Sequence, residues 1–337
     1  MDLQGRSLRL GALVIGAALL LRLTGSGFLA PVVQALEQPG MLSFLVYLET
    51  GRIIRLGDTP SPRPSEDTEP TLPQIPAVPP EIGEAVSFTK EEAAGMVLKN
   101  HTNLQPDLPA LMTQPLTWDL TADAPTVLIY HTHATESYTR SPGENYEESA
   151  RDRTLHLEFN MGAVGEILAD TLEAAGIRLI HDTTLHDYPS YNGSYTASRL
   201  TAEEYLKLYP SICLVLDLHR DAADDGKGGQ IAPAVMTGLG STARIMPVVG
   251  TNAAGSTHPN WKENLSFALQ LSAMLERKTP GITRGIDLRT GRFNQDLTAG
   301  ALLIEVGAAG NTRQEALNAA KILADAIISL ACGTNPD

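Results

Sequence analysis

The sequence predicts an α/β fold: a mixed, mainly parallel sheet with helices on both faces, preceded by a membrane anchor and a proline-rich linker. Short apolar runs, typical of buried strands, alternate with stretches that carry apolar residues at helical spacing. Several of these apolar runs end in a single polar residue. Because ligands bind outside the carboxyl ends of the strands in an open α/β sheet, these polar residues are the first candidates for a site.

Residues 1–36 predict a cytoplasmic tail and a membrane anchor. Arg6 and Arg9 precede an apolar run over residues 10–21, and basic residues before such a run keep the N-terminus in the cytoplasm. The rest of the chain is then extracytoplasmic, beyond a bacterial cell membrane that the chain crosses once. A cleaved signal peptide, with its cleavage site near residues 33–35, is the alternative.

The composition changes after the anchor. Residues 37–81 predict a juxtamembrane segment followed by a linker in which prolines recur through residues 58–80. Proline removes amide donors and fixes φ, so this stretch predicts an extended, semi-rigid spacer. The folded domain is therefore expected over residues 82–337.

Charge and cysteine content exclude some classes of protein. The net charge of −14 and the lack of any basic stripe predict no nucleic-acid partner, because such binding depends on clustered cations. The chain has two cysteines, Cys213 and Cys332. Cys213 lies inside an apolar run, so we expect a small core residue and no disulfide.

The predicted elements alternate along the domain. Gly176 stands where a helix C-terminus favours a left-handed residue, and the motifs at Thr201 and Thr312 have the pattern of capping boxes. Strands are expected over 127–130, 177–180, 213–218, 234–236, 245–249 and 301–306, and helices over 155–175, 201–209, 261–275 and 312–330.

Three residues near the ends of two predicted strands suit a zinc site. Zinc in a hydrolytic site takes three protein ligands and keeps one position open, and two histidines with one glutamate are a common ligand set. His133 and Glu136 follow the strand over 127–130, and His219 ends the strand over 213–218. These three residues are the predicted ligands of Zn²⁺. A plain surface loop is the alternative for His133 and Glu136.

Glu305 interrupts the apolar strand over 301–306. Burying an unpaired carboxylate is costly, which favours a functional explanation. Glu305 is the predicted catalytic base, taking a proton from the attacking water and delivering it to the leaving nitrogen. A charge-paired structural carboxylate is the alternative.

Three further residues near these strands are weaker candidates. On a strict strand His131 shares the face of His133, so it is an alternative metal ligand, a group that orients one, or part of the substrate pocket. Arg220 and Asp221 are candidates for binding a substrate carboxylate or for orienting His219. An ordinary surface ion pair is equally compatible with the last two residues.

A polar segment at residues 291–296 precedes the strand of Glu305. Its polar side chains suit recognition of a sugar-peptide, with a plain turn as the alternative. The candidate substrate-binding residues there are Arg292, Asn294, Gln295 and Asp296.

Four ordered motifs carry a resemblance to a known family. These motifs follow an N-terminal anchor and lie at residues 131–137, 217–221, 293–297 and 303–307. They resemble the stage II sporulation protein P family. That resemblance covers roughly residues 126–330. It implies a zinc-dependent cell-wall hydrolase of endospore formers, similar in fold to N-acetylmuramoyl-L-alanine amidases and zinc carboxypeptidases. It also implies action in engulfment beside stage II sporulation proteins D and M.

The resemblance also implies roles for particular residues. His133, His219 and Glu305 correspond to a strand-end ligand, a later ligand and the catalytic glutamate of the related amidases. The middle ligand of those amidases opens the following helix, which corresponds to Glu158. Glu136 is kept as the predicted ligand because a His-x-x-Glu pattern recurs in zinc carboxypeptidases of related topology.

The predicted function is therefore a membrane-anchored zinc amidase. Its substrate is the peptidoglycan amide between the muramyl lactyl group and L-alanine, with peptide cross-links as further targets. One alternative is a zinc carboxypeptidase or endopeptidase acting on wall peptides. Another is a domain that binds the wall as a scaffold and catalyses nothing.

Overall fold

The computed structural model describes residues 83–116 and 118–334, which belong to one compact unit, Ile75–Asp337. The predicted anchor over 1–36 and the linker over 37–81 lie outside the described residues. Within the described ranges, no helix combines the length and the apolar content that crossing a bilayer requires.

The described residues form a seven-stranded sheet in the order β1-β8-β7-β9-β4-β2-β3. Every neighbouring pair is parallel except β7 with β9, so the predicted mixed, mainly parallel sheet is confirmed. The strands are β1 (Leu98–Asn100), β2 (Val127–Tyr130), β3 (Leu179–His181), β4 (Leu214–Asp221), β7 (Ile245–Val249), β8 (Ile286–Leu288) and β9 (Ala301–Ala308). The predicted strand over 234–236 lies outside this sheet, because β5 (Ala234–Thr237) pairs only with β6 (Gly240–Ala243) as a hairpin.

Helices fill most of the connections between the strands. They are α4 (Lys90–Gly95), α5 (Leu108–Met112), α6 (Met161–Ala174), α7 (Ser194–Leu208), α8 (Trp261–Lys278) and α9 (Arg313–Cys332), with short 3₁₀ turns η1 (Leu157–Phe159) and η2 (Gln295–Leu297). The predicted capping box of α9 is confirmed, since Thr312 and Glu315 exchange side-chain and backbone hydrogen bonds.

Two predicted helix starts are wrong. The helix predicted from residue 155 begins only at α6, because the Asn160 side chain accepts a hydrogen bond from the Gly162 amide and caps it there. The helix predicted from Thr201 begins earlier, at Ser194. Thr201 lies inside α7, where its hydroxyl is 2.9 Å from His186 Nε2 instead of capping a helix.

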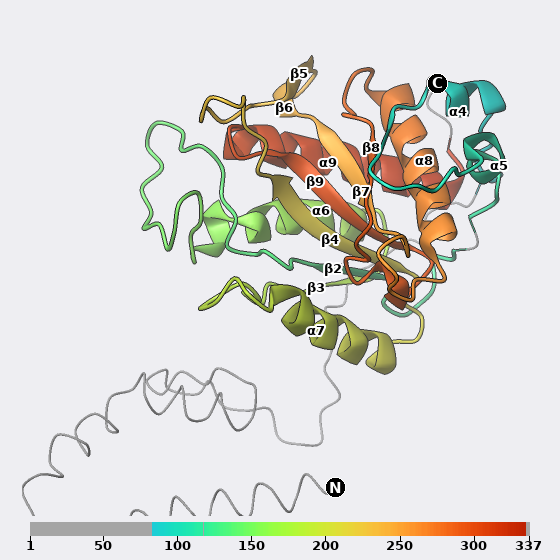
Figure 1. The fold of residues 1–337 in the computed structure, drawn as a ribbon, viewed down its shortest axis with the longest axis horizontal. Coiled ribbons are helices and arrows are strands. Elements are labelled where there is room, and N and C mark those ends of the chain that lie inside the picture. The colour runs from blue at the N-terminus through green and yellow to red at the C-terminus, as the bar shows by residue number, and fades with distance from the viewer. Residues whose placement is uncertain (1–82, 117, 335–337) are drawn as a thin grey trace, which may run out of the picture. The chain divides into compact units, whose positions relative to one another are not determined.

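The helices cover both faces of the sheet, as predicted. The main core packs α6, α8 and α9 against one face, and α7 packs against the other face (Figure 1). Alternate residues of each strand therefore enter different environments. In β9, Leu302 and Ile304 belong to the main core, whereas Leu303 lies in a small cluster on the α7 side.

The α7 side of the sheet is where the polar residues of the strands lie. Val215 of β4 packs in the α7 cluster, so Asp217 and His219 follow it on that face. Glu305 follows Leu303 on β9 in the same way. The central strands thus present apolar residues to the main core and polar residues to the opposite face.

Candidate active site

His219 and Glu305 are neighbours across two central strands. Parallel pairing of β4 and β9 places their Cα atoms in register, on strands about 4.8 Å apart. Both side chains point to the α7 side of the sheet, near the carboxyl ends of their strands. The strand pairing therefore brings the predicted second histidine ligand and the predicted base together.

His133 reaches the same face from the loop after β2. Its ring lies edge-on to the ring of His219, with centroids 5.1 Å apart. His133 is buried, and its Nδ1 atom has no hydrogen-bond partner among the described residues. The chain turns after Tyr130, the last residue of β2, and this turn carries His133 to the α7 side.

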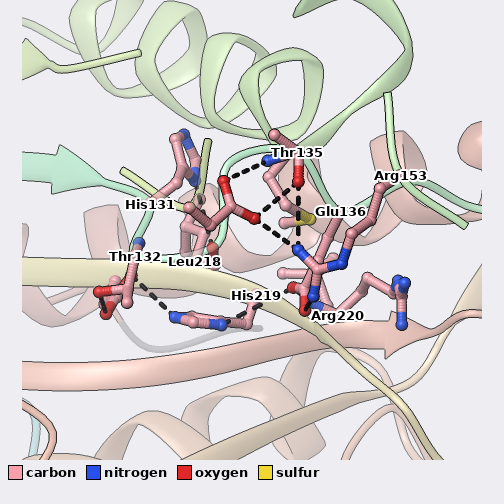
Figure 2. A network of polar contacts seen from close by, with 12 residues as sticks. His131, Thr132, Thr135, Glu136, Arg153, Leu218, His219 and Arg220 are labelled. Carbon is pink, nitrogen blue, oxygen red and sulfur yellow. Dashed lines mark hydrogen bonds and ion pairs between the residues drawn. The ribbon is translucent and has the colours of Figure 1, made fainter. Parts of the chain in front are cut away.

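Glu136 completes the predicted group. Its Oε2 atom is 3.7 Å from His219 Nδ1 and accepts a hydrogen bond from the Arg220 amide at 3.3 Å. Its other oxygen, Oε1, is 3.3 Å from Nη2 of Arg153. Figure 2 shows Arg153 and His219 on either side of this carboxylate. The loop residue Glu136 therefore bridges a cation and the strand-end histidine.

Asp217 lies next to the other ring nitrogen of His219. The His219 Nε2 atom lies 2.9 Å from Asp217 Oδ1, a close ion-pair contact that is not aligned as a hydrogen bond. Asp217 also accepts hydrogen bonds from the Thr132 amide at 2.7 Å and the Thr132 hydroxyl at 2.6 Å. This leaves Nδ1 as the nitrogen of His219 that faces Glu136. A carboxylate behind a histidine is a common way to orient a metal ligand.

A second polar network supports the loop that carries His133 and Glu136. Asp187 accepts a hydrogen bond from the Thr135 hydroxyl at 2.6 Å and forms an ion pair with Arg153. Arg153 in turn reaches Glu136, so these contacts tie the loop to the β3–α7 connection. Sequence reasoning missed Asp187 and Arg153, because nothing in the local pattern marks either residue as a partner of the loop.

Two tyrosines from the start of α7 and the preceding loop line the site. Tyr191 stacks on His133 with ring centroids 4.4 Å apart, and 55% of its surface is exposed. Tyr195 meets His133 edge-on at 5.5 Å and lies parallel to His219 at 6.4 Å. The two tyrosines were not predicted from the sequence, because aromatic residues near the start of a helix do not by themselves indicate a site.

Burial and mutual charge shift the pKa values of the central residues. Burial raises the pKa of Glu305 to about 8, and the nearby Glu136 adds to this effect. Burial lowers the pKa of His133 to about 3, with the His219 charge acting in the same direction. Burial also disfavours the charged form of His219, but Asp217, Glu136 and Glu305 outweigh it and raise that pKa to about 9.

His131 is placed apart from this group. Its Nδ1 donates to the Leu218 carbonyl at 3.2 Å, and its Nε2 lies 2.9 Å from His181 Nε2. Both ring nitrogens are therefore occupied on the α6 side of the sheet, where Gly165 leaves room for the two rings. In this placement His131 links the ends of β2 and β4, a structural role that was not among those predicted for it.

The two candidate glutamates lie in different surroundings. Glu136 is buried next to His219, whereas Glu158 is exposed on η1. No described contact joins Glu158 to His133 or His219. The structure therefore brings Glu136, and not Glu158, together with the two histidines.

Arg220 and Asp221 take part in internal contacts. The Arg220 guanidinium donates to the carbonyl of Ser137 and to the carbonyl of Asp152, each at 2.9 Å. Asp221 forms an ion pair with Arg284 at 2.7 Å. Arg220 therefore fastens the loop after β2 to the end of β4, and Asp221 ties that strand to the segment before β8.

The segment over 291–296 packs against α7 and β7. The Asn294 side chain donates to the carbonyl of Tyr195, and the Gln295 side chain donates to the carbonyl of Val248. Asp296 accepts from Arg199 at 2.9 Å and lies 3.5 Å from Arg292. Three of the four predicted substrate contacts thus use their polar groups within the protein, while the Arg292 side chain is 41% exposed.

The residue types gathered here suit Zn²⁺, which binds imidazole nitrogen and carboxylate oxygen. His133 Nδ1 and Glu305 Oε2 are buried without a hydrogen-bond partner among the described residues, an unusual state for polar atoms. As they stand, however, no three His, Cys, Asp or Glu side chains of the described chain are arranged to hold a metal ion. Arg153 also occupies one oxygen of Glu136. Zinc binding therefore stays a prediction.

These elements define a mixed α/β protein with a cluster of histidines and carboxylates at the carboxyl ends of β2, β4 and β9. Residues 74–328 match the family described as Stage II sporulation protein P (SpoIIP). The chain belongs to this family, which confirms the resemblance found in its motifs.

Individual relatives and structures are similar to this chain. "Stage II sporulation protein P" of Bacillus subtilis (strain 168) is 32% identical over 217 residues, which cover 61% of this chain and 51% of that protein. The chain thus matches about half the length of this relative. An N-acetylmuramoyl-L-alanine amidase from Clostridium difficile 630 has a TM-score of 0.39 at 16% identity, covering 63% of this chain and 97% of that chain. The catalytic domain of the CD27L endolysin targeting Clostridia difficile has a TM-score of 0.37 at 13% identity, covering 63% and 99%.

Proposed function

We propose that this protein is a zinc-dependent peptidoglycan hydrolase that cleaves the amide between N-acetylmuramic acid and L-alanine. The observation that carries the proposal is the convergence of separate stretches of chain on one face of the sheet. His219 and Glu305 are in register on adjacent strands, and the ring of His133 lies 5.1 Å from that of His219. Membership of the stage II sporulation protein P family supports the same conclusion.

The chain's own residues take distinct roles in this reaction. His133, Glu136 and His219 hold zinc, and Asp217 orients His219. Zinc, when bound, polarises the scissile carbonyl and makes water a better nucleophile near neutral pH. Glu305 accepts the proton of the attacking water and delivers it to the leaving nitrogen. Its raised pKa suits a group that must both accept and release a proton near pH 7.

A second candidate function is cleavage of a peptide bond in the wall cross-links. The position of Glu136, three residues after His133 and 3.7 Å from His219, favours it. This is the ligand spacing on which the comparison with zinc carboxypeptidases rests. Both reactions hydrolyse an amide and make the same demands on the metal and on Glu305.

The setting of the activity is part of the proposal and is supported by the sequence of residues 1–36 and by the family. We propose a single-pass anchor within residues 1–36, with the catalytic domain on the outer side of the bacterial membrane. Family membership supports a role in engulfment during endospore formation, with stage II sporulation proteins D and M as partners.

The products formed from purified peptidoglycan test this proposal. Release of the intact stem peptide with a free L-alanine amine supports the amidase. Shortened peptides that remain attached to muramic acid support the endopeptidase instead. If the wild-type protein binds the wall but releases neither product, and Glu305→Gln behaves identically, the domain is a scaffold and the proposal fails.

A further inference from the structure

Tyr195 stands at the centre of the site, yet the proposed chemistry leaves it unused. Its ring lies edge-on to His133 and parallel to His219, so the side chain packs beside both predicted metal ligands. No described residue forms a hydrogen bond with its hydroxyl. The hydroxyl is also absent from the buried polar atoms that lack a partner, so it remains accessible to solvent. An accessible, unused donor in this position can meet a substrate.

The surroundings keep this hydroxyl in its donor form. Burial of the ring raises the pKa of Tyr195, and the carboxylates of Asp217, Glu305 and Glu136 raise it further. A phenol has an ordinary pKa of about 10, so the hydroxyl is a hydrogen-bond donor near neutral pH.

The segment over 291–296 positions Tyr195. The ring of Phe293 lies 5.8 Å from that of Tyr195, and the Asn294 side chain donates to the Tyr195 carbonyl at 2.9 Å. Both residues have left-handed backbone conformations, with φ of 49° for Phe293 and 57° for Asn294. Such conformations are uncommon for residues other than glycine and often occur at functional sites. The motif that suggested sugar recognition thus supports a side chain of the site.

We propose that Tyr195 is a catalytic residue whose hydroxyl donates a hydrogen bond to the oxygen of the scissile carbonyl. This inference rests on the proposed amide hydrolysis. Water adds to the carbonyl carbon and gives its proton to Glu305, and the carbonyl oxygen gains negative charge. The Tyr195 proton stays on the phenol throughout. The carbon–nitrogen bond then breaks as Glu305 delivers the proton to the leaving amine. Phe293 and Asn294 act as positioning residues.

The donor role predicts a specific kinetic defect. Tyr195→Phe keeps the ring that packs against His133 and His219 and removes only the donor. We expect kcat to fall by about 10²–10³-fold, the effect of removing one donor to a developing oxyanion. The KM, the zinc content and the thermal unfolding midpoint should stay close to wild type. The substrate is an N-acetylmuramoyl-peptide prepared from purified peptidoglycan, and the protein is the intact chain.

The matched control is Tyr209→Phe. Tyr209 follows the C-terminal end of α7 and packs in the small cluster on that side, away from His133. This variant also loses one phenolic hydroxyl, and we expect wild-type kcat. If Tyr195→Phe retains wild-type kcat while the wild type hydrolyses the substrate, the inference is wrong and the proposed function stands. If the wild type releases no amine from any wall substrate, both are wrong.

A double-mutant cycle separates positioning from packing. Phe293→Leu should lower kcat by less than Tyr195→Phe, because it displaces the donor without removing it. In the Tyr195→Phe background, Phe293→Leu should lower kcat no further, since the two residues act through the same hydrogen bond. Equal effects of Phe293→Leu in both backgrounds would show that Phe293 acts independently of the Tyr195 hydroxyl.

Discussion

The two faces of the sheet have opposite properties, although the same strands build both. On β4, Leu216 faces the main core under α6 and α9, and Asp217 beside it faces the α7 side. On β9, Ile304 and Glu305 show the same alternation. Apolar burial on one face supplies stability, so the other face can hold charged groups that cost stability. Because side chains alternate along a strand, one residue stabilises the core and the next residue contributes to the candidate site.

The polar face is costly because its charges are buried. Both Glu305 and His219 have strongly shifted pKa values, which means that the fold favours one protonation state of each at the expense of the other. Buried ionisable groups with strongly shifted pKa values are characteristic of functional sites, although structural ion pairs produce them too. The variants below distinguish these explanations by altering one face at a time.

The largest effect is expected from Glu305→Gln. Loss of the base should lower kcat on muramoyl-peptides by about 10³-fold or more, with wall binding retained. The neighbouring change Ile304→Val, on the core face, should instead cost about 0.5–1.5 kcal/mol of unfolding free energy and leave kcat unchanged. Steady-state kinetics and denaturant unfolding of both variants provide the comparison. Equal kinetic losses in the two variants would mean that the faces are not functionally distinct.

The next largest effect is expected from a substitution on the core face, which should lower the free energy of unfolding. Leu216 is fully buried, and Leu216→Ala should cost about 2–5 kcal/mol of unfolding free energy through the cavity it leaves. The kcat per folded molecule should stay near wild type, because the side chain points away from the site. Urea titration followed by activity at low urea measures both quantities. A large fall in kcat without destabilisation would contradict this assignment.

A smaller effect is expected from the residue behind His219. Asp217→Asn keeps the shape of the side chain but removes the charge that orients the imidazole and raises its pKa. Zinc affinity should fall by about 10–100-fold, the usual effect of losing a carboxylate behind a histidine ligand. Competition with a chromogenic chelator measures this affinity. Unchanged zinc affinity would show that Asp217 serves only to hold Thr132.

The smallest effect concerns the pH dependence of the metal-free protein. The fold raises the pKa of Glu305 from 4.5 to about 8, so its contribution stabilises the fold fully below pH 4.5 and is lost as the pH rises through 8. Glu305→Gln removes this dependence. Above pH 8 the variant should be more stable than the chelator-treated wild type, and near pH 4 the two should agree. Parallel unfolding curves across this range would contradict the shift.

Much of the fold could be predicted because its signals are local. The strands around His219 and Glu305 are short apolar runs that end in polar residues, and the Thr312 capping box lies within one turn. The start of α7 could not be predicted in this way. The pattern at Thr201 resembles a cap, but His186 from a distant loop engages that hydroxyl inside the helix.

Residues that act across long sequence distances were harder to predict. His131 and His133 should share a face on a regular strand, but β2 ends at Tyr130 and the turn sends their side chains to opposite sides. Asp217 could have been identified, because it lies two residues before His219 on the same strand face. The contribution of Tyr195 depends on the tertiary packing of α7 and has no counterpart in the local sequence.

The central claim is that one zinc ion binds between His133, Glu136 and His219. The most direct test is the metal content of the purified protein, measured for the wild type and for His133→Ala, Glu136→Ala, His219→Ala and Glu158→Ala. We predict one zinc per chain in the wild type and in Glu158→Ala, and a marked loss in the other three variants. A wild-type protein without zinc, or zinc lost in Glu158→Ala but kept in Glu136→Ala, would contradict the account.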